Sequence, residues 1–208
     1  MLAGSSTVFE DRLTWEAEIK RSPYRLRFEL NGGVEGPVDA IPYASLFVGA
    51  LDRARALFDA TFIGSTHVFA VVGSWPLHGG KDGFRALQRM GVPALDIADE
   101  WDGAPFCGGH RSRRNWRHRV VEITGDKTSR DTMLWSNLAV DFGIKPVAPV
   151  DVAFVDPNRR LYLHAYDDRG MDVISVEKEM LASLRRDFDA WILNYDRARI
   201  DQAFGIDG

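Results

Sequence analysis

The segment from residue 150 to residue 176 constrains the fold of this chain more than any other. Two apolar runs of strand length, at 152–155 and 161–166, flank the turn sequence Asp-Pro-Asn-Arg at 156–159. A second turn, Asp-Asp-Arg-Gly at 167–170, leads into a third short apolar run. These residues favour tight turns, because Pro fixes φ, Gly tolerates positive φ, and Asp and Asn side chains bond to turn backbone. The segment therefore predicts three adjacent antiparallel strands.

In the second strand, successive side chains are expected to point to opposite faces of the sheet. Leu161, Leu163 and Ala165 fall on one side, and Tyr162, His164 and Tyr166 fall on the other. Beyond the strands, apolar residues recur at helical spacing and predict an amphipathic helix that packs on the sheet. The residues of this stripe are Leu181, Leu184, Phe188, Trp191, Ile192 and Tyr195.

The rest of the chain predicts an α+β fold: a mostly antiparallel sheet with a C-terminal three-strand meander, covered by amphipathic helices. Between Gly73 and Gly109, frequent Gly and Pro predict long surface loops around one short helix. We expect one domain over residues 1–208, or two closely packed subdomains at 1–145 and 146–208. Helices are expected at 10–19, 43–62, 82–90 and 129–142, the last capped by Ser129, and strands at 24–30, 67–72 and 120–124.

Four segments together resemble a bacterial family, domain of unknown function 3885. They read YRLRFELNGG at 24–33, RARALFDATF at 53–62, LHAYDDRGMDVI at 163–174 and WILNYDR at 191–197. The most specific part is the YDDRG turn with the amphipathic helix that follows it. The resemblance spans most of the chain apart from residues 91–119. It implies an α+β domain with helices on a mostly antiparallel sheet, and it supplies no catalytic residues.

Composition excludes several classes of protein. With 208 residues, 45% of them hydrophobic, the chain can bury a substantial core and is not intrinsically disordered. No apolar run approaches the roughly 20 residues that span a bilayer, and the start, MLAGSSTVFEDR, lacks the basic and apolar regions of a secretion signal. The lone Cys107 cannot form an internal disulfide. We therefore expect a cytoplasmic protein without membrane contact.

A polar cluster on the second turn is the first candidate for chemistry. Carboxylates alternating with a histidine could bind a divalent metal or supply an acid and a base, which gives a metal-dependent hydrolase as one alternative. The other interpretation is structural, because Asp side chains bond to turn backbone and Asp–Arg pairs tie turns to their neighbours. The spacing matches no specific metal signature, and we expect neither a metal nor another cofactor. The cluster comprises His164, Asp167, Asp168, Arg169 and Asp172.

The sequence RSRRNWRHR at 111–119 is the second candidate. Arginines can clamp phosphates and an exposed Trp can stack on a base, so nucleic-acid binding is a further alternative. A net charge of −4 and the lack of a nucleic-acid fold signature argue against it. Contact with an acidic protein partner, or with an acidic turn of this chain, explains the stretch equally well. Its arginines are Arg111, Arg113, Arg114, Arg117 and Arg119.

Other patterns predict no chemistry. Cys107 and His110 are too close in sequence to imply a nucleophile–base pair, and no motif surrounds them. The glycine pairs at 32–33, 79–80 and 108–109 follow neither the phosphate-loop nor the dinucleotide-binding spacing. We therefore expect no catalytic residue and no nucleotide site.

Aromatic residues in Gly- and Pro-rich segments support our leading hypothesis, a non-enzymatic cytoplasmic protein-binding module. An aromatic side chain in a loop either tucks beneath it or presents itself to a partner. Most concretely, we expect an immunity protein that neutralises a cognate bacterial toxin. Residues 151–208 hold 12 acidic against 8 basic residues, which would steer this region toward a basic, nuclease-like partner. The candidate contacts are Trp75, His78, Trp101, Arg113, Arg114, Trp116 and Arg117.

Overall fold

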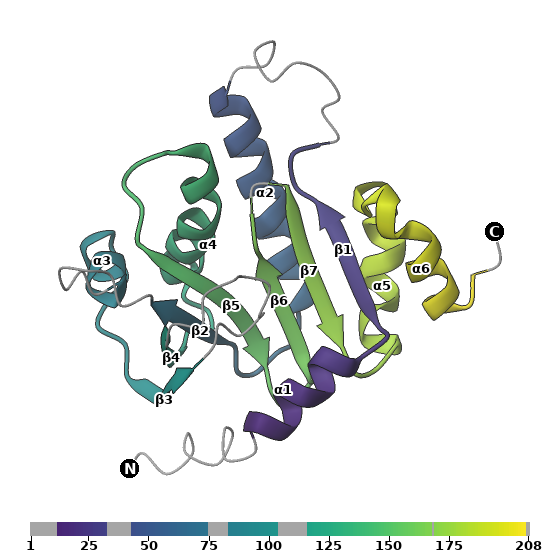
Figure 1. Ribbon diagram of the computed structural model, residues 1–208, viewed down its shortest axis with the longest axis horizontal. Coiled ribbons are helices and arrows are strands. Elements are labelled where there is room, and N and C mark those ends of the chain that lie inside the picture. The colour runs from purple at the N-terminus through teal and green to yellow at the C-terminus, as the bar shows by residue number, and fades with distance from the viewer. Residues whose placement is uncertain (1–11, 33–42, 75–82, 104–115, 168, 207–208) are drawn as a thin grey trace.

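A seven-stranded antiparallel sheet forms the centre of the molecule (Figure 1). The computed structural model describes residues 12–32, 43–74, 83–103, 116–167 and 169–206. The C-terminal meander β5–β6–β7 lies between β1 and β2 of the N-terminal half, so distant parts of the chain share one sheet. Whether residues 1–145 and 146–208 are separate subdomains stays a prediction. The strands, in spatial order, are β1 (Arg25–Glu29), β7 (Gly170–Ser175), β6 (Leu161–Ala165), β5 (Val150–Asp156), β2 (Phe69–Ser74), β4 (Trp116–Glu122) and β3 (Ile97–Gly103).

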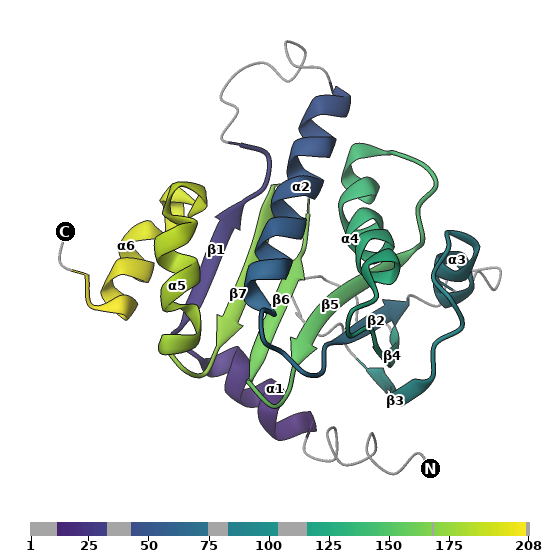
Figure 2. The ribbon, with the colours of Figure 1, turned by 180° about the vertical axis from the view of Figure 1, so that it is seen from behind.

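Helices cover the two faces of this sheet unequally. Three of them, α2, α4 and α5, lie across the back (Figure 2), whereas α1 crosses the lower part of the front, the face toward the viewer in Figure 1. The predicted α+β class and C-terminal meander are confirmed. None of the helices in the described ranges is long and apolar enough to cross a membrane. The helices are α1 (Arg12–Arg21), α2 (Tyr43–Thr61), α3 (Gly83–Arg89), α4 (Lys127–Phe142), α5 (Glu179–Asp187) and α6 (Asn194–Phe204), with a 3-10 turn at Asp189–Trp191.

The core has a layer on each side of the sheet, and β6 shows how the sequence divides them. Leu161 and Leu163 lie in the larger layer, beneath the back helices. Tyr162 lies in the smaller layer with Trp15 and Ile19 of α1. The predicted alternation is therefore confirmed. Each fully buried side chain of this size contributes roughly 1.5–3 kcal/mol, so the strand is fixed in register from both sides.

The start of α4 differs from its prediction. Asp126, not Ser129, is the N-cap: its carboxylate accepts hydrogen bonds from the Ser129 backbone N–H at 3.0 Å and from the Ser129 hydroxyl at 2.5 Å. The helix begins at Lys127 and ends at Phe142, and the next residue, Gly143, caps it with a φ of 62° that suits glycine. An acidic cap also places negative charge at the positive end of the helix dipole.

The C-terminal apolar stripe is not one helix, as its spacing predicts, but two helices separated by an extended step. Ile192 has φ −66° and ψ 127°, and it forms an isolated bridge with Phe28. The backbone N–H of Leu193 donates to the carbonyl of Arg27 at 2.9 Å. The extended step gives hydrogen-bond partners to backbone groups at the edge of β1. These bonds replace the ones that a continued helix would have made.

Strand β3 lies where the sequence predicts loops. Its residues, IADEWDG, lack the alternation of apolar and polar side chains by which strands are recognised. It pairs with β4 at the end of the sheet, and the register shifts between Ile97 and Asp99. Its cross-strand ion pairs, described below, involve arginines of the basic stretch.

Candidate functional site

A row of polar and aromatic side chains crosses the front of the sheet above α1. In register, Arg27 lies opposite Asp172, which lies opposite His164. One step along, Asp151 lies opposite Gly73, Gly73 opposite His118, and His118 opposite Trp101. His164 and Asp172 each lie two positions along their strand from a residue of the buried front layer, Tyr162 and Ile174. Residues two apart in a strand, and residues opposite each other in register, point to the same face, so the row lies on the front of the sheet. We call this set the front row: Arg27, Asp172, His164, Asp151, Gly73, His118 and Trp101.

Arg27 is the hub of the end formed by β1, β7 and α6. Its Nε lies 2.8 Å from Asp172 Oδ1, and its Nη1 lies 3.0 Å from Asp196 Oδ2. Its guanidinium also stands 5.7 Å from the ring centre of Tyr166. The hydrogen bond to Asp172 holds the pKa of Arg27 above its usual value, although burial acts in the opposite direction. Arg27 therefore joins two strands and a helix with a permanent charge.

Tyr166 folds over the backbone of Gly170. A Cβ at residue 170 would lie 2.0 Å from the phenol oxygen, so only glycine allows this placement. Burial first, and then the Asp172 carboxylate, raise the pKa of Tyr166 to about 12. The phenol is therefore protonated at neutral pH and can act as a hydrogen-bond donor.

The polar turn cluster does not converge on one point. Asp167 accepts from the backbone N–H groups of Arg169 at 2.9 Å and Gly170 at 2.8 Å, and from the Arg169 side chain at 3.1 Å. Asp172 faces Arg27 instead, and Asp168 lies outside the described residues. Asp167 and Asp172 thus have the partners that the structural interpretation of the cluster describes: turn backbone for Asp167, and arginines for both.

His164 pairs with a residue that the sequence analysis missed. Its Nε2 lies 2.5 Å from Asp151 Oδ1, and only 7% of its side chain is exposed. Asp151 lies 13 residues before His164, on the neighbouring strand β5, and the register of β5 and β6 brings the two side chains together. Within the described ranges, no group of three or more His, Cys, Asp and Glu side chains could hold a metal ion.

Aromatic rings form the other end of the front row. The ring of His118 stacks with Trp101 at 4.9 Å and with Trp116 at 6.5 Å, with interplanar angles of 18° and 16°. Gly73 makes room for them, because a Cβ there would lie 3.1 Å from Trp116 and 3.2 Å from His118. Two predicted partner contacts, Trp101 and Trp116, therefore share the front with the polar residues.

Of the remaining predicted contacts, only Arg117 lies within the described residues. Trp75, His78, Arg113 and Arg114 lie outside the described residues, as do Arg111, Cys107 and His110. Arg117 is described, and its Nε lies 3.1 Å from Asp102 Oδ1 and 3.5 Å from Glu100.

Carboxylates of β3 neutralise the described part of the basic stretch. Besides the contacts of Arg117, the Nε of Arg119 lies 2.8 Å from Glu100 Oε2. The hydrogen bond from Arg117 lowers the pKa of Asp102 below its ordinary value. The sequence analysis gave an acidic turn of this chain as one alternative partner for the stretch, whereas the carboxylates that contact Arg117 and Arg119 lie on a strand, β3.

The fold and the front row define an α+β protein with a charged and aromatic sheet face. The chain belongs to the family described as domain of unknown function DUF3885, whose model matches residues 6–196 of 208. No curated protein and no solved structure matches the chain. The predicted family is therefore confirmed, and roles for individual residues must come from the structure itself.

Proposed function

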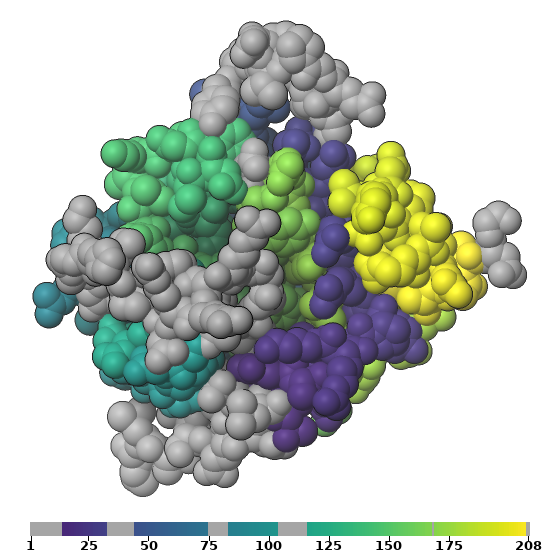
Figure 3. Space-filling model, viewed as in Figure 1, coloured from purple at the N-terminus to yellow at the C-terminus, as the bar shows by residue number. Residues whose placement is uncertain are grey.

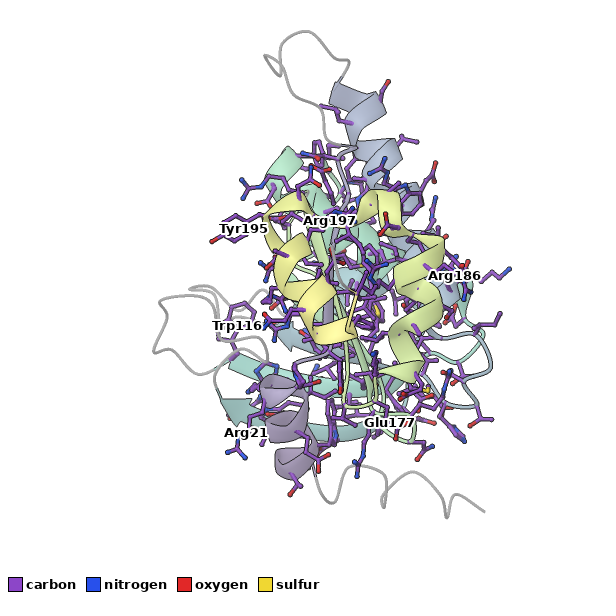
Figure 4. All side chains as sticks on the ribbon, turned by 90° about the vertical axis from the view of Figure 1, so that its right-hand side faces the viewer. Arg21, Trp116, Glu177, Arg186, Tyr195 and Arg197 are labelled. Atoms are coloured by element: carbon purple, nitrogen blue, oxygen red, sulfur yellow. The ribbon has the colours of Figure 1, made fainter. Side chains whose placement is uncertain are left out.

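We propose that this protein is a non-enzymatic cytoplasmic binding module that neutralises a cognate bacterial toxin by covering the toxin's active site. The supporting observation is that aromatic side chains from four elements border one face of the sheet. They are Trp101 of β3, Trp116 of β4, Tyr166 after β6 and Tyr195 of α6. Figure 4 shows Trp116 and Tyr195 projecting toward the side on which α1 lies. Aromatic and arginine side chains are the typical anchors of protein interfaces.

The charged residues between these aromatic side chains are already held in place. Arg27 is fixed by Asp172 and Asp196, and His164 by Asp151. A surface whose side chains are ordered before binding loses less conformational entropy when a partner docks. This rigidity supports a binding surface that fits a partner without rearrangement.

An enzyme is the alternative, and it would rest on His164. A general base needs a ring nitrogen within reach of the substrate proton. Here Asp151 pairs with one ring nitrogen, Nε2, and the 7% exposure of the His164 side chain leaves a substrate little access to the ring. The arrangement is better suited to holding a carboxylate in position than to taking a proton from a ligand, which favours the binding function.

Purification of the tagged protein from its native cells at moderate salt, with mass spectrometry of the co-eluting proteins, tests the proposal. We expect a stoichiometric toxin domain. Co-expression of that domain with this protein should restore growth, whereas the domain alone should arrest it. Recovery of the protein without a partner, or growth arrest despite co-expression, would contradict the proposal.

A further inference from the structure

Three ion pairs at the end of the sheet formed by β1, β7 and α6 share one arrangement: the arginine is the more exposed partner. Side-chain exposure is 28% for Arg27 against 14% for Asp172, and 45% for Arg199 against 10% for Asp196. The difference is largest in the turn, with 72% for Arg169 against 20% for Asp167. The carboxylates therefore lie beneath and the guanidinium groups face outward.

This order is not a general property of arginine pairs in the molecule. Between α5 and α6 it is reversed, with 15% exposure for Arg185 against 25% for Asp201. Arg197 is likewise less exposed than Asp189, at 32% against 47%. Single pairs elsewhere also have the outward arginine, as Arg186 does at 74% against 54% for Asp187. The front differs in that three such pairs lie around Arg27 and the turn beside it.

Two tyrosines accompany this positive layer. Tyr195 is 89% exposed, the largest value among the exposed large hydrophobic residues of the described segments, and Tyr166 is 38% exposed. Arg27 links them, because it contacts both the Tyr166 ring and Asp196, the neighbour of Tyr195. In the space-filling view α6 stands beside β1 on the front surface (Figure 3). We call this set the tyrosine–arginine patch: Arg27, Tyr166, Arg169, Tyr195 and Arg199.

Contacts of its sequence neighbours fix the backbone of the first turn of α6 at Tyr195. The next residue, Asp196, binds Arg27 and Arg199. The residue after it, Arg197, donates to the side chain of Asp189 at 2.9 Å and to its carbonyl at 2.8 Å. A tyrosine held in this way offers a large contact area at a small entropic cost.

We infer that the tyrosine–arginine patch is the contact surface for the partner and that the facing surface of the partner is an acidic protein surface. This inference rests on the proposed function. It replaces the basic partner expected from the sequence with an acidic one. The acidic excess of residues 151–208 suggests a basic partner, but the carboxylates paired with the patch arginines are less exposed than those arginines. Arginine forks bind carboxylates in pairs of parallel hydrogen bonds, and tyrosines pack around such contacts.

Backbone NMR of the labelled full chain tests the charge of the partner without the partner itself. At low salt we expect poly-L-glutamate to shift the signals of Tyr195, Tyr166 and Arg199, and poly-L-lysine to leave them unchanged. Shifts with polylysine, or none with polyglutamate, would overturn the inference. A duplex DNA that displaces polyglutamate from the patch and binds more tightly would overturn it in favour of nucleic acid.

Substitutions then test whether the patch binds the toxin domain. Tyr195→Ala should weaken the complex roughly 30-fold, as for an interface hot spot, and Arg199→Ala should also weaken it. Ile63→Ala is the matched control, because Ile63 is 74% exposed outside the patch, and it should change affinity less than about twofold. Urea unfolding should show that all three variants are folded.

The two proposals fail in different ways. If the wild-type chain protects against the toxin and both patch variants bind it unchanged, the inference about the patch is wrong and the function stands. If no toxin is recovered but polyglutamate binds the patch, the function is wrong and the patch still takes an acidic polypeptide.

Discussion

The two ends of the front row are built from different parts of the chain. At the charged end, Arg27 and Asp172 are 145 residues apart in sequence, and Asp196 is still more distant. At the aromatic end, Trp101, Trp116 and His118 belong to one pair of neighbouring strands. The charged end therefore depends on the completed fold, whereas the aromatic end depends on the β3–β4 pair and its neighbour β2.

Removing Arg27 should cause the largest loss of stability. In Arg27→Ala, the mostly buried carboxylates of Asp172 and Asp196 lose their shared counter-ion, and Arg199 remains only for Asp196. Leaving a buried charge without its partner costs about 3 kcal/mol. Urea unfolding should show this decrease in the free energy of unfolding, with hydrogen exchange faster in β1, β7 and α6 together.

Neutralising the stranded carboxylates provides the control. Adding Asp172→Asn to Arg27→Ala should recover part of the lost stability, because the uncompensated charge is gone. If the two changes are simply additive, the hub is not a coupled unit and the contrast between the two ends is wrong.

Gly73→Ala should damage the aromatic end, by about 1–3 kcal/mol, because the new methyl group forces the His118 and Trp116 rings to move. Hydrogen exchange should accelerate in β2, β3 and β4 but not in β1 or α6. Gly49→Ala in α2 is the matched control, since no atom lies within 4 Å of its added Cβ. That control should stabilise the helix by roughly 0.5–1 kcal/mol. Accelerated exchange at β1 would contradict a local effect.

The charged end should also lose stability at high pH, because Tyr166 ionises there. Its folded pKa of about 12 exceeds its ordinary value of 10.0, so the folded state keeps the proton longer. The associated stability is fully present below pH 10 and is lost as pH rises toward 12. Ultraviolet titration should show that late ionisation decreases by one tyrosine in Tyr166→Phe. In Gly170→Ala the displaced ring should titrate closer to 10. An unchanged late titration in Tyr166→Phe would assign it to another residue.

Arg117→Ala should have the smallest effect, because its ion pairs are exposed and solvent screens them. We expect no measurable change in the urea midpoint. The pKa of the Asp102 carboxyl group should rise toward its ordinary value. In the wild type, 1 M salt should raise the same pKa, because salt screens the interaction with Arg117. Carboxyl-carbon NMR measures this value. A large loss of stability would mean that the β3–β4 pairs hold the sheet as strongly as the Arg27 hub.

The fold was predictable where side-chain periodicity is strong. The helical spacing in α2 reflects burial on one side, and the alternation in β6 assigns its side chains to the two core layers. The break at Ile192 and the strand β3 were not predictable, because both are stabilised by partners on other strands, Phe28 and Arg119. The residue types of the site were found, but not their pairings. His164 binds Asp151 and Asp172 binds Arg27, and only strand register brings these residues together.

The position of the meander also determines when the sheet can be completed during synthesis. Strands β1 and β2 are made early, but their neighbours β7 and β5 lie after residue 149. Until those strands leave the ribosome, the nascent chain holds two strands with unpaired edges, which are prone to pair with other chains. Pairings between such distant segments also close slowly. The last quarter of the chain therefore acts as the closing piece of the fold, and a truncated product would expose the edges that it normally covers.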